Sequence, residues 1–545
     1  IPGLIIGSID RDGVGAECAP SYSLGWGSTF GAIADWLAEY DGYTKHDIYR
    51  DLPPFQATVT APWRLLVLGY TTPNIGDSGG CGSIGKVGVS AGTMARRYRY
   101  TRDPMAALAA YYANGESAEG LGRDIFQADP DATSKEIAEI ARQYEGEENP
   151  FIGGSNRAGY RMASVEYGWG RDGTALWMYY GDTAGGNHGH RDRLNFDIMY
   201  RGICMLPDHG YPEQTGTWPQ RLHCTRNTIF HNTVVVNQMQ QIHEQQGGYP
   251  ELFCQLEDFG AVRVDSPQVY AGVDKYQRTM AFIKLDEERA YAFDVFRVRG
   301  GDDHVYSLHG PPGTVTHSGL NLVAQQGGTY AGPDAPFRDE SLEASMRMFG
   351  YPWLCNVERD VHPPMSFWVD WKAQAGYRGV TEEDDIHLRF WTANQYDDVA
   401  LADAQPPQHL QDNPEWLRYL LTHRTGENLD STFTGILEPY SGQPSIVSVE
   451  RLRVISEPED AATVCLKVTL ADGTVDWLVA SDSDDEVSQA DGGPQFAGAV
   501  GWLRVRDGRV QTAVLSRGTR LALDGFSLSL PEAGYHGTIA KMHRE

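Results

Sequence analysis

Apolar side chains recur at helical spacing over roughly the first 150 residues. After Ser28 and Thr29, which are suited to cap a helix N-terminus, apolar positions return every three or four residues from 30 to 37. The same spacing predicts further helices over residues 57–69, 94–114 and 133–144. Pro104 divides the second of these into two pieces, because proline fits the first turn of a new helix.

From about residue 159 the apolar positions alternate with polar ones in short runs separated by Gly, Asp and Asn. The runs cover residues 174–180, 194–200, 233–237, 291–298, 387–392 and 464–470. Such alternation is typical of a large antiparallel β-sandwich. We therefore predict an α+β multidomain protein, with a helical part over residues 1–155, a large antiparallel sandwich over 156–445 and a small β domain over 446–545.

Length and composition agree with several folded domains. The chain has 545 residues, of which 41% are hydrophobic and 22% charged, and this length exceeds what one core usually serves. No run of about 18 apolar residues is present, so no membrane span is expected. The sequence starts Ile1-Pro2-Gly3, without an initiator Met or a signal-peptide pattern, and we expect that an N-terminal segment is missing.

The net charge argues against two kinds of partner, and the cysteines argue against two kinds of structural site. A formal charge of −28 should repel nucleic acid and anionic lipid, so neither is expected as a partner. An anionic substrate would need a local basic pocket. The seven cysteines are odd in number and lack a Cys-x-x-Cys pair, which argues against a disulfide scaffold and a thiolate zinc knuckle.

The stretch from residue 185 to 198 carries the strongest chemical signal. If it forms one strand, His188, His190 and Asp192 share a face with the apolar positions 194, 196 and 198. Imidazoles and a carboxylate at the edge of a buried face need partners. A metal ion is one way to supply them, and a hydrogen-bonded His/Asp network is the other.

Two later segments have the same character. Asp208 follows an apolar run at 203–206, and His231 opens a run that begins His-Asn-Thr. A carboxylate oxygen with two imidazole nitrogens suits Zn²⁺, with water or a fourth protein ligand completing the shell. His304 and His309 lie in a later strand-like segment, where we expect structural histidines.

These segments together resemble a known signature. Residues 188–212 (HGHRDRLNFDIMYRGICMLPDHGYP), followed by FHNTVVVN at 230–237, are similar to the heparinase II/III superfamily of polysaccharide lyases. The resemblance implies an (α/α) toroid, here incomplete at its N-terminus, followed by antiparallel β-sandwich domains. It also implies a metal, usually zinc although Mn²⁺ is an alternative, bound by His190, Asp208 and His231, with His188 facing the substrate.

A uronate lyase removes the C5 proton beside a carboxylate and expels the oxygen at C4. The carboxylate charge must be neutralised first, and a tyrosine can then act as base and return the proton to the leaving oxygen. The resemblance implies that this tyrosine is Tyr70, in the segment LGYTTPNIGD at residues 68–77. Without the resemblance, any one of the 28 tyrosines would be assigned to packing.

The segment DRDGVGAECAPSY, residues 10–22, resembles the family's carboxylate-neutralising motif through Glu17. Relatives have His or Asn three or four residues before this Glu, where this chain has Val14 and Gly13. The neutralising group is therefore open among His188, Arg11 and a protonated Glu17, and we favour His188. Oligoalginate lyases carry an Asn-His pair here, so its absence favours a glycosaminoglycan over alginate.

The predicted substrate contacts lie in the same segments. They are Arg11, Tyr22, Tyr211, Arg226 and Asn232, with Tyr22 as a cleft wall rather than a base. For Arg226 and Asn232 the alternative is hydrogen bonding to backbone.

The sequence thus predicts a lyase that cleaves an acidic polysaccharide or oligosaccharide by β-elimination and leaves 4,5-unsaturated uronate ends. A metal-dependent glycoside hydrolase and an inactive glycan-binding protein are the alternatives. A periplasmic or secreted location follows from such a substrate, whereas the unpatterned cysteines keep the cytoplasm open. The sequence leaves a homodimer open.

Overall fold

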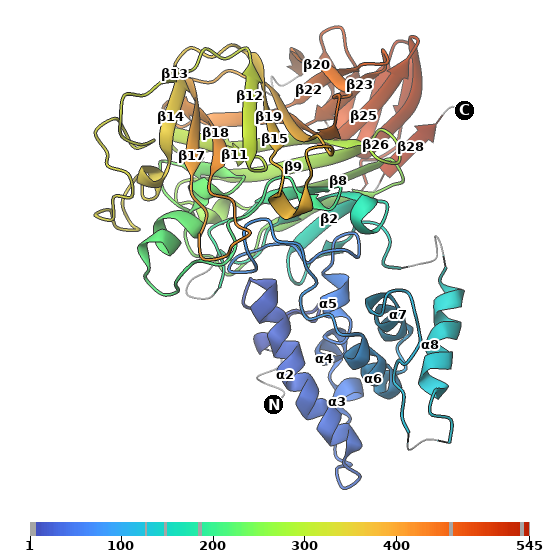
Figure 1. The fold of residues 1–545 in the computed structure, drawn as a ribbon. Coiled ribbons are helices and arrows are strands. Elements are labelled where there is room, and N and C mark those ends of the chain that lie inside the picture. Colours follow the sequence, from blue (N-terminus) through green and yellow to red (C-terminus); the bar gives the residue numbers. More distant parts are fainter. Residues whose placement is uncertain are drawn as a thin grey trace.

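The computed structural model describes residues 7–125, 128–145, 150–183, 188–456, 462–484, 486–534 and 539–543. Residues 185–187, which begin the predicted histidine stretch, lie outside these ranges. Figure 1 shows the helices gathered at one end of the molecule and the sheets stacked at the other. No helix in the described residues has the length and apolarity needed to cross a membrane.

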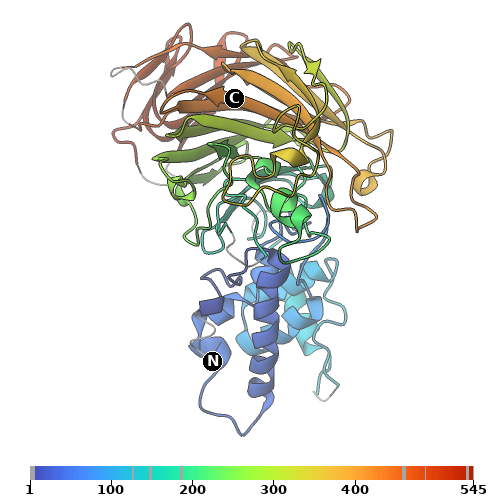
Figure 2. The ribbon, with the colours of Figure 1, turned by 90° about the vertical axis from the view of Figure 1, so that its left-hand side faces the viewer.

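The α-helices of the described residues all precede residue 145. They are α2 (Pro20–Glu39), α3 (Ile48–Asp51), α4 (Pro53–Ala57), α5 (Ala61–Arg64), α6 (Ala91–Thr101), α7 (Pro104–Ala113) and α8 (Ala132–Gln143). Their shared core includes Ala34, Phe55, Trp63 and Met94. The longest, α2, runs from the sheets toward the far end of the helical part (Figures 1 and 2). Its N-terminus therefore lies at the junction where the site is found.

Most of the predicted helices are confirmed, and one is wrong. The break between α6 and α7 falls where predicted, with the Asp103 side chain accepting from the Met105 N–H at 2.9 Å and Pro104 opening α7. The predicted helix at 57–69 is instead reduced to the single turn α5, and Leu68 and Gly69 after it take left-handed conformations with φ of 57° and 58°, which prevent a helix from continuing. This segment becomes the loop that leads into the site.

Antiparallel strands in the described residues form four sheets. The first, next to the helices, contains β1 (Asn156–Arg157), β2 (Met162–Tyr167), β3 (Thr174–Tyr179), β4 (Phe196–Tyr200) and β5 (Ile203–Cys204). The second, which we call the large sheet, has the order β12 (Gly313–Ser318), β15 (Ser366–Ala373), β16 (Ile386–Ala393), β19 (Asp430–Ser441), β10 (Ala290–Arg299), β9 (Lys275–Lys284), β8 (Phe259–Asp265) and β7 (Tyr249–Gln255).

Two further sheets cover the two faces of this large sheet. One has the order β13 (Val323–Ala324), β14 (Cys355–Asp360), β17 (Asp398–Ala404), β18 (Leu417–Thr425), β11 (Asp303–His309) and β6 (Val234–Val236). The C-terminal sheet has the order β20 (Ile446–Leu452), β22 (Val464–Leu470), β23 (Val475–Ala480), β25 (Gln495–Arg506), β24 (Ser488–Ala490) and β21 (Val454–Ser456). Its remaining strands are β26 (Arg509–Leu523), β27 (Phe526–Ser529) and β28 (Ile539–His543).

Alternation along the strands decides which side chains are buried between the sheets. In β16, Leu388 and Phe390 are buried while Arg389 and Trp391 are half-buried on the opposite face. One core lies where the first three sheets meet, and it includes Phe196, Phe282 and Leu308. A second core, with Phe293 and Trp502, joins the large sheet to the C-terminal sheet. Each predicted strand run overlaps an observed strand, whereas the exact domain boundaries stay predictions.

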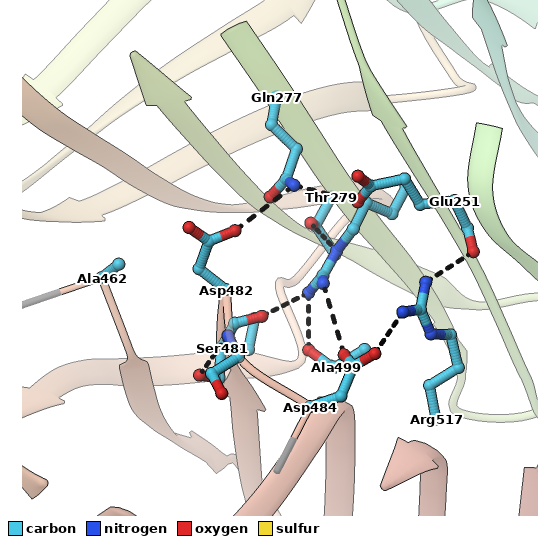
Figure 3. Close-up of polar contacts among 12 residues, drawn as sticks. Glu251, Gln277, Thr279, Ala462, Ser481, Asp482, Asp484, Ala499 and Arg517 are labelled. Carbon is cyan, nitrogen blue, oxygen red and sulfur yellow. Dashed lines mark hydrogen bonds and ion pairs between the residues drawn. The ribbon is translucent and has the colours of Figure 1, made fainter. Parts of the chain in front are cut away.

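The C-terminal sheet is also fixed to the large sheet by buried arginines. The Arg263 guanidinium on β8 donates to the carbonyl oxygens of Ser481 and Ala499 at 2.6 and 2.8 Å. In the other direction, Arg517 on β26 lies between Glu251 and Asp484 (Figure 3). Because charged arginine donors bind backbone carbonyl oxygens of the neighbouring sheet, these contacts add directed hydrogen bonds to the apolar interface between the two sheets.

Candidate functional site

The site forms where the glycine-rich loop after α5, the start of α2 and three loops of the sheet region meet. The prediction that residues 188–198 form one strand is wrong, because β4 begins only at Phe196. Leu194 has a left-handed φ of 65°, and the Asn195 N–H donates to the Asp192 carbonyl at 2.9 Å, which closes a turn. The turn still carries the preceding histidine into the interior.

Four buried side chains form the centre of the site, and we call them the donor set. It consists of His190, Asp192, Asp208 and His231, each of which offers one atom within 4.8 Å of the others. His190, Asp208 and His231 are the predicted metal ligands. Asp192 joins them because the turn before β4 directs it to the same point.

Histidines and aspartates in the donor set carry opposite charges and shift the pKa values of one another. His231 Nδ1 lies 3.0 Å from Asp208 Oδ2, and His190 Nδ1 lies 3.4 Å from Asp208 Oδ1. Although burial works against a charged carboxylate, these two imidazoles hold the pKa of Asp208 well below its usual value. Burial likewise disfavours a charged His190, but Asp208 and a second aspartate raise its pKa to about 9.

Several polar atoms of the donor set make no hydrogen bond of good geometry among the described residues, although His231 Nδ1 and Asp208 Oδ2 lie close enough for an ion pair. The atoms without such a bond are both carboxylate oxygens of Asp192, His190 Nδ1, Asp208 Oδ2 and both ring nitrogens of His231. Burial raises the pKa of Asp192 despite the two nearby histidines. Unpartnered buried polar atoms are costly, so two imidazoles and two carboxylates facing one point fit a small divalent cation.

Asp77 connects the donor set to the surface. Its Oδ1 lies 3.1 Å from His190 Nε2, and its Oδ2 lies 3.2 Å from His188 Nδ1. The Arg221 guanidinium donates to the same Oδ2 at 3.0 Å. Burial alone would raise the pKa of Asp77, but His190 and Arg221 lower it. A buried carboxylate therefore orients a ring of the donor set and the half-exposed His188 together.

Close approach of two backbones places Asp77 there. The Asp77 N–H donates to the His188 carbonyl oxygen at 2.7 Å. The preceding Gly76 has φ of 62°, and a Cβ at this position would lie 2.3 Å from that carbonyl. Only glycine tolerates both conditions. The predicted glycine-rich loop thus serves to bring Asp77 beside the histidines.

His188 lies at the mouth of the site, with about a quarter of its side chain exposed. Tyr22, from the first turn of α2, stacks on its ring with centroids 3.4 Å apart and planes 2° apart. The Tyr22 hydroxyl donates to the Tyr211 hydroxyl at 3.0 Å. Glu17 Oε2 lies 3.9 Å from His188 Nε2. The structure therefore brings together four of the predicted catalytic and substrate-binding residues.

Tyr70 lies in a different cavity. It is half-buried and lines a cleft of about 400 Å³ with Ser83, Arg378 and Asn413. No hydrogen bond or ring contact joins Tyr70 to His188 in the part of the chain that the structure describes. The Tyr70 cleft and the His188 contacts share the loop that contains Asp77, since Gly80 also lines the cleft.

Two predicted substrate contacts are not supported by their positions. Arg11 is exposed and lines a separate cleft of about 490 Å³ with Trp63 and Trp169. Asn232 is 1% exposed, and its side-chain amide donates to the side-chain oxygen of Asn195 at 3.1 Å. The packing of the β4 turn uses Asn232, which leaves it no access to a ligand. We therefore remove Asn232 from the substrate-binding set, whereas Arg11 stays a prediction.

Arg226 lies beside the site, mostly buried. Burial, together with the nearby Arg221 and Arg191, lowers its pKa to about 10 against the attraction of Asp77. This strongly acidic chain thus concentrates positive charge behind Asp77. Arg221 lies within the π-helical turn Gln220–Thr225, and Arg226 directly follows it. Such turns are frequent at functional sites.

His304 and His309 have structural positions. His304 contacts the Ser431 hydroxyl and the Gly300 carbonyl, and His309 contacts the Pro207 carbonyl at 2.8 Å. Asp77 and Arg221 were missed by the sequence reasoning. Asp77 follows Tyr70 in the same quoted segment, so its position was available, but its link to His188 depends on contacts between distant residues.

Comparison with known proteins agrees with this geometry. Residues 156–287 match the family model "Heparinase II/III-like, C-terminal", which confirms the resemblance over the segment that holds the donor set. No curated protein matches the chain.

Two solved structures share the fold. A mutant of the heparan sulfate lyase HepC from Pedobacter heparinus aligns with a TM-score of 0.53 and 13% identity, over 88% of this chain and 60% of its own. A heparinase III described as the BT4657 gene product gives a TM-score of 0.54, 14% identity and the same coverages. The chain thus spans about 60% of the length of these structures.

Proposed function

Because residues 156–287 match the heparinase II/III-like family model and the fold is shared with two solved lyases, we propose that the chain is a heparinase II/III-type polysaccharide lyase that cleaves a uronic-acid-containing polysaccharide by β-elimination. In this proposal the helices α2–α8 are part of an (α/α) toroid, and the substrate lies across the junction between these helices and the sheets. A glycosaminoglycan is the favoured substrate. The two solved relatives are a heparan sulfate lyase and a heparinase III by their names.

The observation that carries this proposal is the bridge from the donor set through Asp77 to His188. Asp77 fixes His188 Nδ1, so Nε2 is the ring nitrogen available at the mouth of the site. A positioned imidazole there can bind the uronate carboxylate and stabilise the charge that develops when the C5 proton leaves. Glu17 lies near the same nitrogen and can share a proton with it.

Tyr70 is our proposed base and acid. Its cleft is open enough for a sugar, and it is lined by Tyr70, Ser83, Arg378 and Asn413. The phenol would take the C5 proton and return it to the O4 leaving group. In this proposal a sugar in the Tyr70 cleft extends along the Asp77 loop to His188, so that one uronate contacts both residues.

We also propose that the donor set holds Zn²⁺, or another divalent cation such as Mn²⁺. His190, Asp208 and His231, together with Asp192, would supply its ligands. When bound, the cation supplies positive charge that neutralises the buried carboxylates and fixes the loops on which they lie. Asp77 would then be the carboxylate that orients a ligand histidine from behind, an arrangement common in protein metal sites.

The local charge suits an anionic substrate. The chain as a whole carries −28, but Arg221 and Arg226 lie behind His188 and Asp77. A basic region of this kind meets the requirement that the net charge imposes on any acidic polysaccharide partner.

The test is the ultraviolet absorbance of the unsaturated uronate, followed with heparin, heparan sulfate, hyaluronan, chondroitin sulfate, dermatan sulfate and alginate. Parent protein should produce the chromophore on at least one glycosaminoglycan, and His188→Ala and Tyr70→Phe should each lower its rate of formation by about 10³-fold or more. New reducing ends without the chromophore would replace elimination with hydrolysis. Binding without any cleavage would identify a glycan-binding protein.

A further inference from the structure

The orientation of His188 depends on more than Asp77. The last side-chain torsion of histidine has broad minima, so one contact at Nδ1 leaves the ring free to tilt. Tyr22 covers the ring with a parallel stack at 3.4 Å. The Asp77 contact and the Tyr22 stack therefore restrain the ring in two different directions and leave Nε2 at the mouth of the site.

Tyr22 is itself anchored at both ends. Its backbone is in the first turn of α2, and its hydroxyl donates to the Tyr211 hydroxyl. Tyr211 is held in turn by a bond of 2.7 Å from its N–H to the Gly79 carbonyl oxygen. The anchor thus belongs to the same glycine-rich loop that carries Asp77.

The environment of Tyr22 excludes it as a base. Burial and the hydrogen bond to Tyr211 raise the pKa of Tyr22, and the carboxylates of Asp77 and Glu17 act in the same direction. Tyr22 therefore keeps its proton, and its ring rather than its hydroxyl faces the histidine. Its effect on a reaction must pass through His188.

We propose that Tyr22 is a positioning residue, whose ring holds His188 with Nε2 directed to the substrate and whose hydroxyl is fixed by Tyr211. This inference rests on the proposed lyase function. It assigns the ring and the hydroxyl of Tyr22 different tasks, and substitutions can separate them.

The experiment compares Tyr22→Leu, which removes the ring, with Tyr22→Phe and Tyr211→Phe, which each remove the same hydrogen bond. Tyr22→Leu should lower kcat by about 30- to 100-fold with KM changed less than about twofold, because misplacing a catalytic group by about 1 Å has an effect of that size. Each Phe variant should lower kcat by about two- to fivefold, and the double variant should be no worse than either single one.

A His188→Ala background supplies the control that a purely structural role would not pass. In that background Tyr22→Leu should have no further effect on the residual rate, since the group that it positions is gone. An equal loss in both backgrounds would overturn the inference. So would a Tyr22→Phe variant as impaired as Tyr22→Leu, because the hydroxyl rather than the ring would then be responsible.

Crystal structures of the parent and Tyr22→Leu proteins give a readout that does not need activity. The inference requires the His188 ring to turn or to occupy several orientations when Tyr22 is removed, while the donor set is unchanged. A ring that keeps its orientation would overturn the positioning role. If the parent cleaves no polymer, the proposed function fails, and this structural comparison still decides whether Tyr22 positions His188.

Discussion

Among the histidines that bridge two aspartates in the described residues, His190 and His423 have different surroundings. His190 lies between Asp77 and Asp208, at 3.1 and 3.4 Å. His423, on β18, lies between Asp398 and Asp303, at 2.7 and 3.1 Å. Burial opposes the charged form of both rings, yet the flanking carboxylates raise the pKa of each to about 9.

The difference lies in the next neighbours. At the His423 bridge, the Asp398 carboxylate also binds Arg359, and the Asp303 carboxylate accepts a hydrogen bond from the Gln238 side chain at 3.0 Å. Only Oδ1 of Asp303 is left without a hydrogen-bond partner among the described residues of this bridge. The donor set adds Asp192 and His231, and in the described part of the chain both carboxylate oxygens of Asp192 and Nε2 of His231 have no hydrogen-bond partner. A proton is sufficient for the His423 bridge, whereas the donor set around His190 has the composition of a metal site.

The largest expected effect is at His188, which Asp77 links to His190. His188→Ala should lower kcat by about 10³-fold or more, because it removes the group that we assign to carboxylate neutralisation. His423→Gln should leave kcat within about twofold, since it lies in the other bridge. Steady-state kinetics of both variants tests the contrast, and equal losses would remove the distinction between the two bridges.

Removing a side chain of the donor set should lower the metal content of the protein, whereas removing His423 should not. We expect His231→Ala to lose its bound metal and about 3 kcal/mol or more of unfolding free energy, because buried carboxylates are left without a counter-charge. Metal analysis and urea unfolding measure both effects. His423→Ala should keep the metal content of the parent, and a His231→Ala protein that does the same would exclude His231 as a ligand.

A smaller effect is expected behind the donor set. Asp77→Asn keeps the size of the side chain but removes the charge that orients His190 and His188. Loss of such an orienting carboxylate typically costs about 10- to 100-fold in metal affinity, which competition with a chelator can measure. Asp398→Asn is the matched control, and an equal change of metal affinity in both variants would contradict the assignment.

The smallest effect concerns the proton at His423. Because its folded pKa of about 9 exceeds the unfolded value near 6.5, its stabilisation is complete below about pH 6.5 and is lost as the pH rises through about 9. We expect the loss to be about 2 kcal/mol, after allowance for partial exposure of the ring. Unfolding free energies from pH 6 to 10 should show this slope in the parent and a weaker slope in His423→Gln. Identical slopes would show that the proton is not held there.

The sequence was sufficient for features that depend on local pattern. Helical spacing before residue 145 and alternation after it predicted the order of helices and sheets, and the family resemblance of the segments beside apolar runs implied the set His190, Asp208 and His231. The continuous strand from 188 to 198 was wrong because the pattern of side chains does not report a left-handed residue such as Leu194.

What the sequence could not show depends on contacts between distant segments. Asp77 reaches His188 because two backbones meet at Gly76, and Tyr22 reaches it because α2 begins at the junction with the sheets. No periodicity encodes such meetings. The same reason explains why Arg11, which shares a motif with Glu17, lies in another cleft.

The most direct test of the account is anomalous X-ray scattering from crystals of the parent protein, recorded on both sides of the zinc absorption edge. The account predicts one strong peak about 2.0–2.2 Å from ligand atoms of His190, Asp208 and His231, and none beside His423. A peak at His423 instead, or a structure refined without any ion or water bridging the donor set, would contradict the distinction on which the proposed site rests.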